Sequence, residues 1–205
     1  MKKRQSDRAK HARGRIAQEA ARLMIEGGIH DFHLAKRKAI ARLRLPDSVK
    51  LPGNEEVEEA IQTYQRLFLG DLQPSQLNEL RHAALKAMKF LERYKPRLVG
   101  SVLTGTADAN SEVCLHVFAQ TAEDLAIFLM NHAIDYQQTE RRVRMSSAES
   151  VRMPAFRFVA DGVQLELVVF SESDRRHPPL SPVDGRPMRR ANLAEVANLA
   201  ASFES

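Results

Sequence analysis

Apolar side chains in the first hundred residues recur every three to four positions, which is the spacing of a helix with one buried face. The pattern predicts helices over residues 8–26, 31–44, 54–69 and 75–94. Gly27-Gly28 is expected to end the first of them, because glycine readily leaves the helical conformation. The first half of the chain therefore reads as all-helical.

Each predicted helix has an apolar and a polar face, and Asn54 and Ser75 are the expected N-caps of the third and fourth helices. The residues expected to face inward are Ile16, Ala20, Leu23 and Met24, then Phe32, Ala35, Ala39, Ile40 and Leu43, then Val57, Ile61, Tyr64 and Phe68, and finally Leu77, Leu80, Ala84, Met88 and Leu91. The residues expected to face outward on the second helix are Lys36, Arg37, Lys38, Arg42 and Arg44.

The pattern changes near Pro96, where short β-rich runs replace the helical spacing. The clearest feature is a hairpin, in which Asp161-Gly162 joins the runs 155–160 and 163–170, because this dipeptide favours a two-residue turn. The other expected elements are strands over 98–99, 113–119 and 135–145, a helix starting at Thr121 with Asp124 in a capping box, a loop over 173–189 and a helix over 192–203. Helices followed by mixed elements predict an α+β fold, with a helical region over 1–95 and an α+β domain over 96–205.

Positive charge is concentrated at the start of the chain. Residues 1–50 hold 14 Lys and Arg against five Asp and Glu, whereas the whole chain has a net charge of +5. Clustered cations release counterions when they meet phosphates, so the first 45 residues are a candidate contact for RNA or DNA. The alternative is a solvated basic arm without a partner.

Two further features bear on the class of protein. No run of about 18 apolar residues is present, so neither a membrane span nor membrane association is expected. The lone Cys114 has no partner for an internal disulfide, which favours a cytoplasmic location.

Candidate chemistry lies between Gly100 and Val117. Gly100-Ser101, a loop containing Gly105, and an acidic residue opening a β-rich run form one spacing pattern. The positions that match it are Gly100, Ser101, Gly105, Ala107, Ser111, Glu112, Val113 and Leu115. This segment resembles the core of small nucleotidyltransferases of the DNA polymerase β superfamily, and the resemblance extends to Glu166 in a later strand.

The resemblance implies a nucleotidyltransferase-like mixed sheet flanked by helices, and a site that takes Mg²⁺ and a nucleoside triphosphate without a covalently bound cofactor. It assigns metal binding to Glu112, Cys114 and Glu166, with the two carboxylates as the catalytic residues. Gly100, Ser101 and Gly105 would approach the phosphates through their backbone and hydroxyl groups. Arg141 and Arg142 are the expected additional phosphate ligands.

Cys114 departs from the family pattern, which has an acid at this position. A thiol is a poor ligand for Mg²⁺. A zinc site that adds His116 is one alternative, and a small buried side chain at Cys114 is another. Glu166 and the arginines at 141, 142, 144, 152 and 157 could equally form structural ion pairs.

Two functions remain open from the sequence. The favoured one is a protein with reduced or lost catalysis that binds nucleotide or nucleic acid. The alternative is an active Mg²⁺-dependent enzyme that moves a nucleoside monophosphate from a triphosphate to a protein, RNA or small-molecule acceptor.

Overall fold

The computed structural model describes residues 2–29, 31–46, 48–70, 72–108 and 110–201. The chain divides into two compact units, residues 1–73 and 74–205. The expected boundary at residue 95 differs from this division, because the long helix that precedes it packs with the second unit. None of the described helices is long and apolar enough to cross a membrane.

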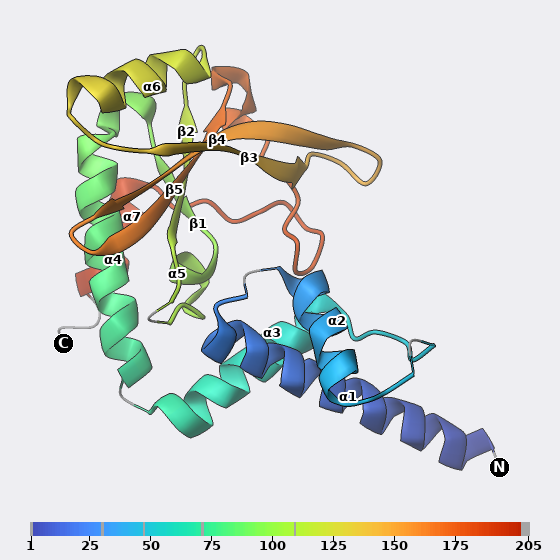
Figure 1. Ribbon diagram of the computed structural model, residues 1–205. Helices are drawn as coiled ribbons and strands as arrows, with labels where there is room; N and C mark the ends of the chain where they lie inside the picture. The colour runs from blue at the N-terminus through green and yellow to red at the C-terminus, as the bar shows by residue number, and fades with distance from the viewer. Residues whose placement is uncertain (1, 30, 47, 71, 109, 202–205) are drawn as a thin grey trace. The chain divides into compact units, whose positions relative to one another are not determined.

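The first unit is helical. Its elements are α1 (Lys2–Gly27), α2 (Phe32–Arg42), α3 (Asn54–Tyr64) and the π-helical turn η1 (Gln65–Leu69) (Figure 1). Both α2 and α3 pack against α1. The side chains in this small core are mostly alanine and isoleucine, namely Ile16, Ala17, Ala20, Ala21, Ile25, Ala35, Ala39, Ile40, Val57 and Ile61.

Two predicted orientations in this unit are wrong. Lys36 was expected to face outward, but it is buried, because the end of the loop before α3 and the first residue of α3 offer acceptors to it. Its ammonium donates to the Pro52 carbonyl at 3.0 Å and to Asn54 Oδ1 at 2.6 Å. Phe68 was expected in the core, yet 68% of it is exposed. The wider turn of η1 rotates the residues that follow Tyr64 away from the α3 face, which places Phe68 outside.

Two predicted caps also differ. The N-cap of α3 is Gly53, whose backbone N–H donates to Glu56 Oε2 at 2.7 Å, so Asn54 is already helical. Ser75 lies inside α4, which begins at Leu72. The predicted cap of α6 at Thr121 is confirmed, since its hydroxyl accepts from Asp124 N.

The second unit is an α+β fold. Its elements are α4 (Leu72–Phe90), η2 (Glu92–Tyr94), β1 (Arg97–Val99), α5 (Ser101–Thr104), β2 (Val113–Phe118), α6 (Ala122–Asn131), β3 (Gln137–Arg144), β4 (Ser150–Ala160), β5 (Val163–Phe170), η3 (Glu172–Arg176) and α7 (Leu193–Ala201). Within the described residues, five strands form one mixed sheet in the order β1-β2-β5-β4-β3. Only the β2–β5 pair among them is parallel. The α+β class and the mixed sheet are therefore confirmed.

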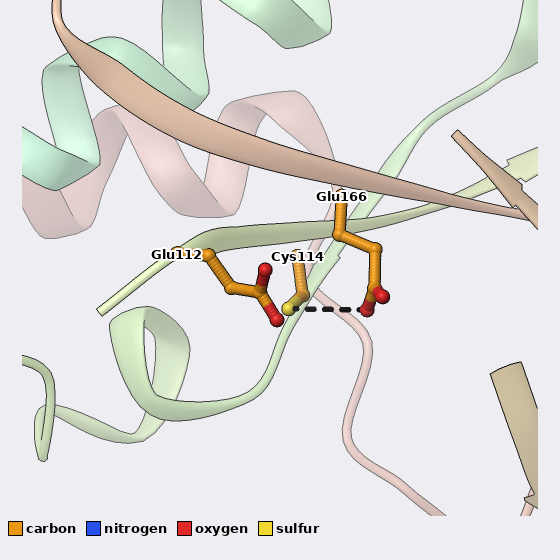
Figure 2. Close-up of side chains that lie close together, drawn as sticks. All are labelled: Glu112, Cys114 and Glu166. Atoms are coloured by element: carbon orange, nitrogen blue, oxygen red, sulfur yellow. Dashed lines mark hydrogen bonds between the residues drawn. The ribbon is translucent and has the colours of Figure 1, made fainter. Parts of the chain in front are cut away.

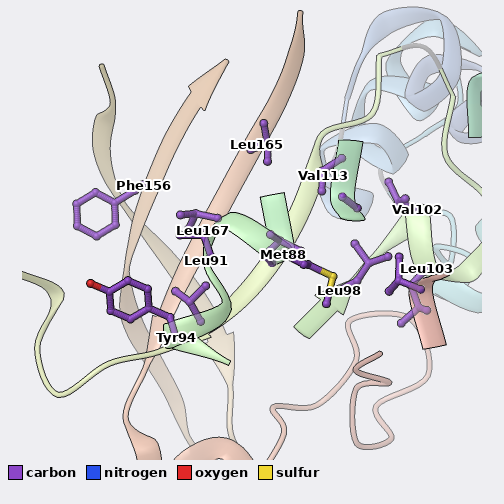
Figure 3. Close-up of a cluster of buried hydrophobic side chains, with 14 of the residues drawn as sticks. Met88, Leu91, Tyr94, Leu98, Val102, Leu103, Val113, Phe156, Leu165 and Leu167 are labelled. Carbon is purple, nitrogen blue, oxygen red and sulfur yellow. The ribbon is translucent and has the colours of Figure 1, made fainter. Parts of the chain in front are cut away.

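One face of this sheet carries the main core. Its side chains alternate along the strands and pack against α4, α6 and α7 (Figure 3). The largest buried members are Met88, Leu91, Leu98, Leu115, Leu125, Leu129, Phe156, Leu165 and Leu167. This continuous apolar layer holds the strands in register, and the alternation directs the intervening side chains to the other face.

The second face is apolar at one end and polar at the other. Phe118, Ala155, Val168 and Phe170 form a small cluster there. The segment after η3 runs from one edge of the sheet to the other, since Leu180 bridges to Arg144 of β3 and Ala191 bridges to Leu98 of β1. Its Arg190 guanidinium lies 4.8 Å from the centre of the Phe170 ring. The polar end of this face carries Cys114 and Glu166.

A pair of substitutions on β4 tests which face is the core. Phe156→Ala should lower the free energy of unfolding by about 3–5 kcal/mol, because it leaves a cavity in the main core. Val159→Ala removes a side chain that is 62% exposed and should cost less than about 1 kcal/mol. Urea unfolding followed by circular dichroism measures both. Equal losses would show that β4 is not oriented as described.

Candidate functional site

The strand register places three chemically different side chains in one row. Cys114 of β2 lies opposite Glu166 of β5, and Glu166 lies opposite Arg157 of β4. Directly opposed residues point to the same face of a sheet, so the thiol, the carboxylate and the guanidinium are neighbours. Glu112 comes two residues before Cys114, just ahead of β2, and its carboxylate reaches the same place (Figure 2).

The glycine-serine loop follows β1 and lies beside Cys114, at one end of this row. Gly100 has φ +74°, and a Cβ placed there would lie 3.9 Å from the Cβ of Cys114. Ser101 opens the short helix α5, whose backbone N–H groups at Thr104 and Gly105 donate to Gly100 and Ser101 carbonyls. Gly105 ends that helix with φ +89°. Both glycines therefore occupy left-handed backbone positions that other residues rarely adopt.

Asp108 is a buried acid in this loop that the sequence reasoning did not single out. Its Oδ1 accepts from the backbone N–H of Asn110 at 2.8 Å and from the Ser111 hydroxyl at 3.2 Å. These bonds form a tight turn just before Glu112, so Asp108 positions the acid. Asp followed three residues later by Ser is typical of such side-chain turns, and this spacing could have revealed the turn from the sequence.

The three predicted metal ligands do come together. One ligand atom each from Glu112, Cys114 and Glu166 lie within 4.8 Å of one another. The Cys114 thiol donates to Glu166 Oε2 over 3.8 Å, the dashed contact in Figure 2. By distance alone, this set could surround a divalent cation.

Two arginines already neutralise the carboxylates. Arg157 contacts Glu166 Oε1 through Nη2 at 2.8 Å and Nε at 3.0 Å, and its Nη2 lies 3.4 Å from Glu112 Oε1. Arg141 Nη1 lies 3.4 Å from Glu166 Oε2. Glu166 is only 2% exposed, so its charge depends on these partners. The guanidinium of Arg157 bridges the two acids that a metal ion would bridge.

The protonation states agree with this arrangement. Burial raises the pKa of the Cys114 thiol, and the charges of Glu166 and Glu112 raise it further. The thiol is therefore neutral at physiological pH and donates a hydrogen bond to Glu166. Burial alone would lower the pKa of Arg157, but the same two carboxylates outweigh it and the pKa is raised.

His116 lies further along the same face, in a different environment. It is buried, its ring is 4.5 Å from that of Phe170, and its Nδ1 accepts from Arg190 Nε at 2.9 Å. Burial, with the charges of Arg190 and Arg141, lowers its pKa to about 3. The metal-ligand cluster found among the described residues does not include His116, so the zinc alternative has no support from this geometry.

The predicted phosphate ligands separate into two groups. Arg141 points to the site, whereas Arg142 is the next residue on β3 and points to the other face. The two-residue turn at Asp161-Gly162 pairs Ala160 with Val163, and the same register pairs Arg157 with Glu166. The hairpin signal in the sequence therefore contained enough information to single out Arg157 from the other arginines.

No protein-family model matches this chain, and the search of curated proteins found no match either.

The buried ion pair can be tested by unfolding. Arg157→Ala should lower the free energy of unfolding by about 1–3 kcal/mol, because it leaves Glu166 buried with weaker compensation; the arginine is 44% exposed, which limits the loss. Combining it with Glu166→Gln should restore part of that loss. The control is Arg152→Ala, whose pairing with Glu140 is largely exposed and should contribute less than about 1 kcal/mol. A double variant as unstable as the single one would mean that Arg157 acts through packing and not through charge.

Proposed function

We propose that the second unit is a nucleotidyltransferase-like domain that binds nucleotide phosphates and has lost metal-dependent transfer. The observation that carries this proposal is the Arg157 guanidinium, which contacts both Glu112 and Glu166 inside the ligand cluster. Two carboxylates and two guanidinium groups already balance in charge. A divalent cation is not needed to neutralise this site.

Replacing the guanidinium by Mg²⁺ would be costly. Mg²⁺ demands nearly ideal octahedral geometry with oxygen ligands at about 2.0–2.1 Å, and it loses its water reluctantly. The cluster offers two carboxylates and a neutral thiol, and a thiol does not replace the missing oxygen ligand. Binding would also break the contacts that Arg157 makes with both acids. The expected loss of transition-state stabilisation is several kcal/mol.

The same place offers two cationic side chains for phosphate binding. The Arg141 and Arg157 side chains are each 44% exposed, so a ligand in solution can reach them. A guanidinium donates to phosphate oxygens in a planar, two-pronged geometry. The Ser101 hydroxyl is a further candidate donor, on the loop whose Gly100 lies against Cys114. The favoured ligand is therefore a nucleoside triphosphate held mainly by arginines.

An active Mg²⁺-dependent nucleotidyltransferase is the second candidate. The closeness of the Glu112, Cys114 and Glu166 ligand atoms favours it. In that case an incoming Mg²⁺–nucleotide would displace Arg157 from the two acids, and the released guanidinium would pair with the triphosphate. The acceptor of the nucleoside monophosphate would be a protein, an RNA or a small molecule.

Calorimetry with ATP, GTP, CTP and UTP separates the two functions. We expect at least one nucleotide to bind the wild-type protein with an affinity that changes less than about threefold between excess Mg²⁺ and EDTA, because guanidinium groups supply the charge. Arg141→Ala should weaken that binding by about tenfold, the loss of one charge-assisted contact. Arg142→Ala is the matched control, since it removes the same charge from the other face of β3 and should change little.

Other outcomes of this experiment would distinguish the proposal from the active enzyme. Nucleotide binding that requires Mg²⁺, or release of pyrophosphate with an acceptor mixture, would establish the active enzyme instead. Mg²⁺-independent binding by the wild-type protein together with Mg²⁺-dependent binding by Cys114→Asp would show an intact architecture with a missing ligand, which supports the proposal. Absence of nucleotide binding in the wild-type protein would refute it.

A further inference from the structure

The outer face of α2 is a basic stripe on the first unit. The sequence Lys36-Arg37-Lys38 divides between two roles. Lys36 is buried and bound to Pro52 and Asn54, whereas Arg37 and Lys38 are exposed. The buried lysine fixes α2 to the following loop, so the two exposed cations are held on a supported helix.

The exposed face has a narrow apolar centre with cations on both sides. Leu34 is 47% exposed and Ala41 is exposed, and these two lie seven residues apart on one line of the helix. At about 100° per residue, Arg37 projects about 60° to one side of Leu34 and Lys38 about 40° to the other. The exposed Arg42 lies beyond Lys38 on the same side.

Few acids compensate these charges. No acidic residue lies within α2. Asp31, at its N-cap, is bonded through its side chain to the Leu34 N–H at 2.6 Å, and Glu19 of α1 lies 3.3 Å from Arg42. Among the described residues, Arg37 and Lys38 have no acidic partner within ion-pair distance. Their charges are available to an external anion.

We propose that α2 lies in the major groove of double-stranded DNA, with Arg37 on one phosphate wall and Lys38 and Arg42 on the other. The major groove is about 12 Å wide and admits an α-helix. A centre of Leu34 and Ala41 carries no hydrogen-bonding side chain, so base edges are approached only by apolar contact. The binding is consequently driven by phosphate contacts and depends weakly on sequence.

The same geometry disfavours the other polyanions. The major groove of an RNA helix is deep and narrow, so a whole helix does not enter it. A membrane-surface helix needs a broad apolar face to bury in the lipid, whereas this face exposes one leucine between cations. The surface belongs to the first unit, so the inference does not depend on the nucleotide site of the second.

Fluorescence anisotropy with the full-length protein tests this assignment. The probes are a 24-base-pair DNA duplex of mixed sequence, an RNA hairpin of equal length and vesicles containing about one third phosphatidylserine. We expect binding to the DNA duplex that weakens as salt rises. Arg37→Ala combined with Lys38→Ala should reduce the slope of log K against log salt by about 2, one for each lost phosphate contact. Affinity in moderate salt should fall by about tenfold or more.

Matched variants keep the test specific. Lys86→Ala combined with Lys89→Ala removes two exposed charges from α4 and should leave the slope unchanged. Leu34→Glu places an acid at the centre of the stripe and should abolish DNA binding without changing the thermal unfolding midpoint. The Arg37/Lys38 double variant should keep its nucleotide affinity, which would show that its loss of DNA binding does not arise at the nucleotide site.

Several results would overturn the proposal. These are equal slopes for the α2 and α4 variants, stronger binding to the RNA hairpin or the vesicles than to the duplex, and no binding to any probe.

Discussion

Glu166 is the residue on which the site depends. A carboxylate that is 2% exposed is costly in a protein interior unless opposite charge and hydrogen bonds compensate it. Arg157, Arg141 and the Cys114 thiol supply that compensation. Because these partners come from β2 and β4, which flank β5, and from the edge strand β3, the acid ties the sheet together as well as forming the site. Any ligand or metal must reach it through this existing set of contacts.

The sheet makes that arrangement possible by separating two kinds of face. Alternation along β2, β4 and β5 sends leucine and phenylalanine to the helices and sends Cys114, Arg157 and Glu166 the other way. The parallel β2–β5 pair is decisive, since it brings residues 52 positions apart into direct opposition. The apolar layer buries the hydrophobic side chains of the sheet, so the other face is free to carry charged groups.

In the first unit, the position of each side chain on the helix likewise decides the role of Lys36 and of its neighbours Arg37 and Lys38. The buried ammonium of Lys36 donates hydrogen bonds to two protein oxygens in place of water, and these bonds hold α2 to the start of α3. Arg37 and Lys38 differ from it only in helical phase, and they are exposed. Charge composition alone does not distinguish these roles, because the difference arises from where the loop before α3 returns. The two proposed activities therefore lie in separate units with separate physical causes.

The sequence by itself determined the element types, the α+β class, the hairpin at Asp161-Gly162 and the inward faces of most helices, because these depend on local spacing and turn chemistry. It also brought Glu112, Cys114 and Glu166 together as candidates. The hairpin also pairs Arg157 with Glu166, but only the tertiary structure decided that Arg157 reaches Glu112, that Lys36 is buried and that Phe68 is not. Those outcomes depend on cross-strand register, a returning loop and a π-helical turn, which join residues that no short sequence pattern relates.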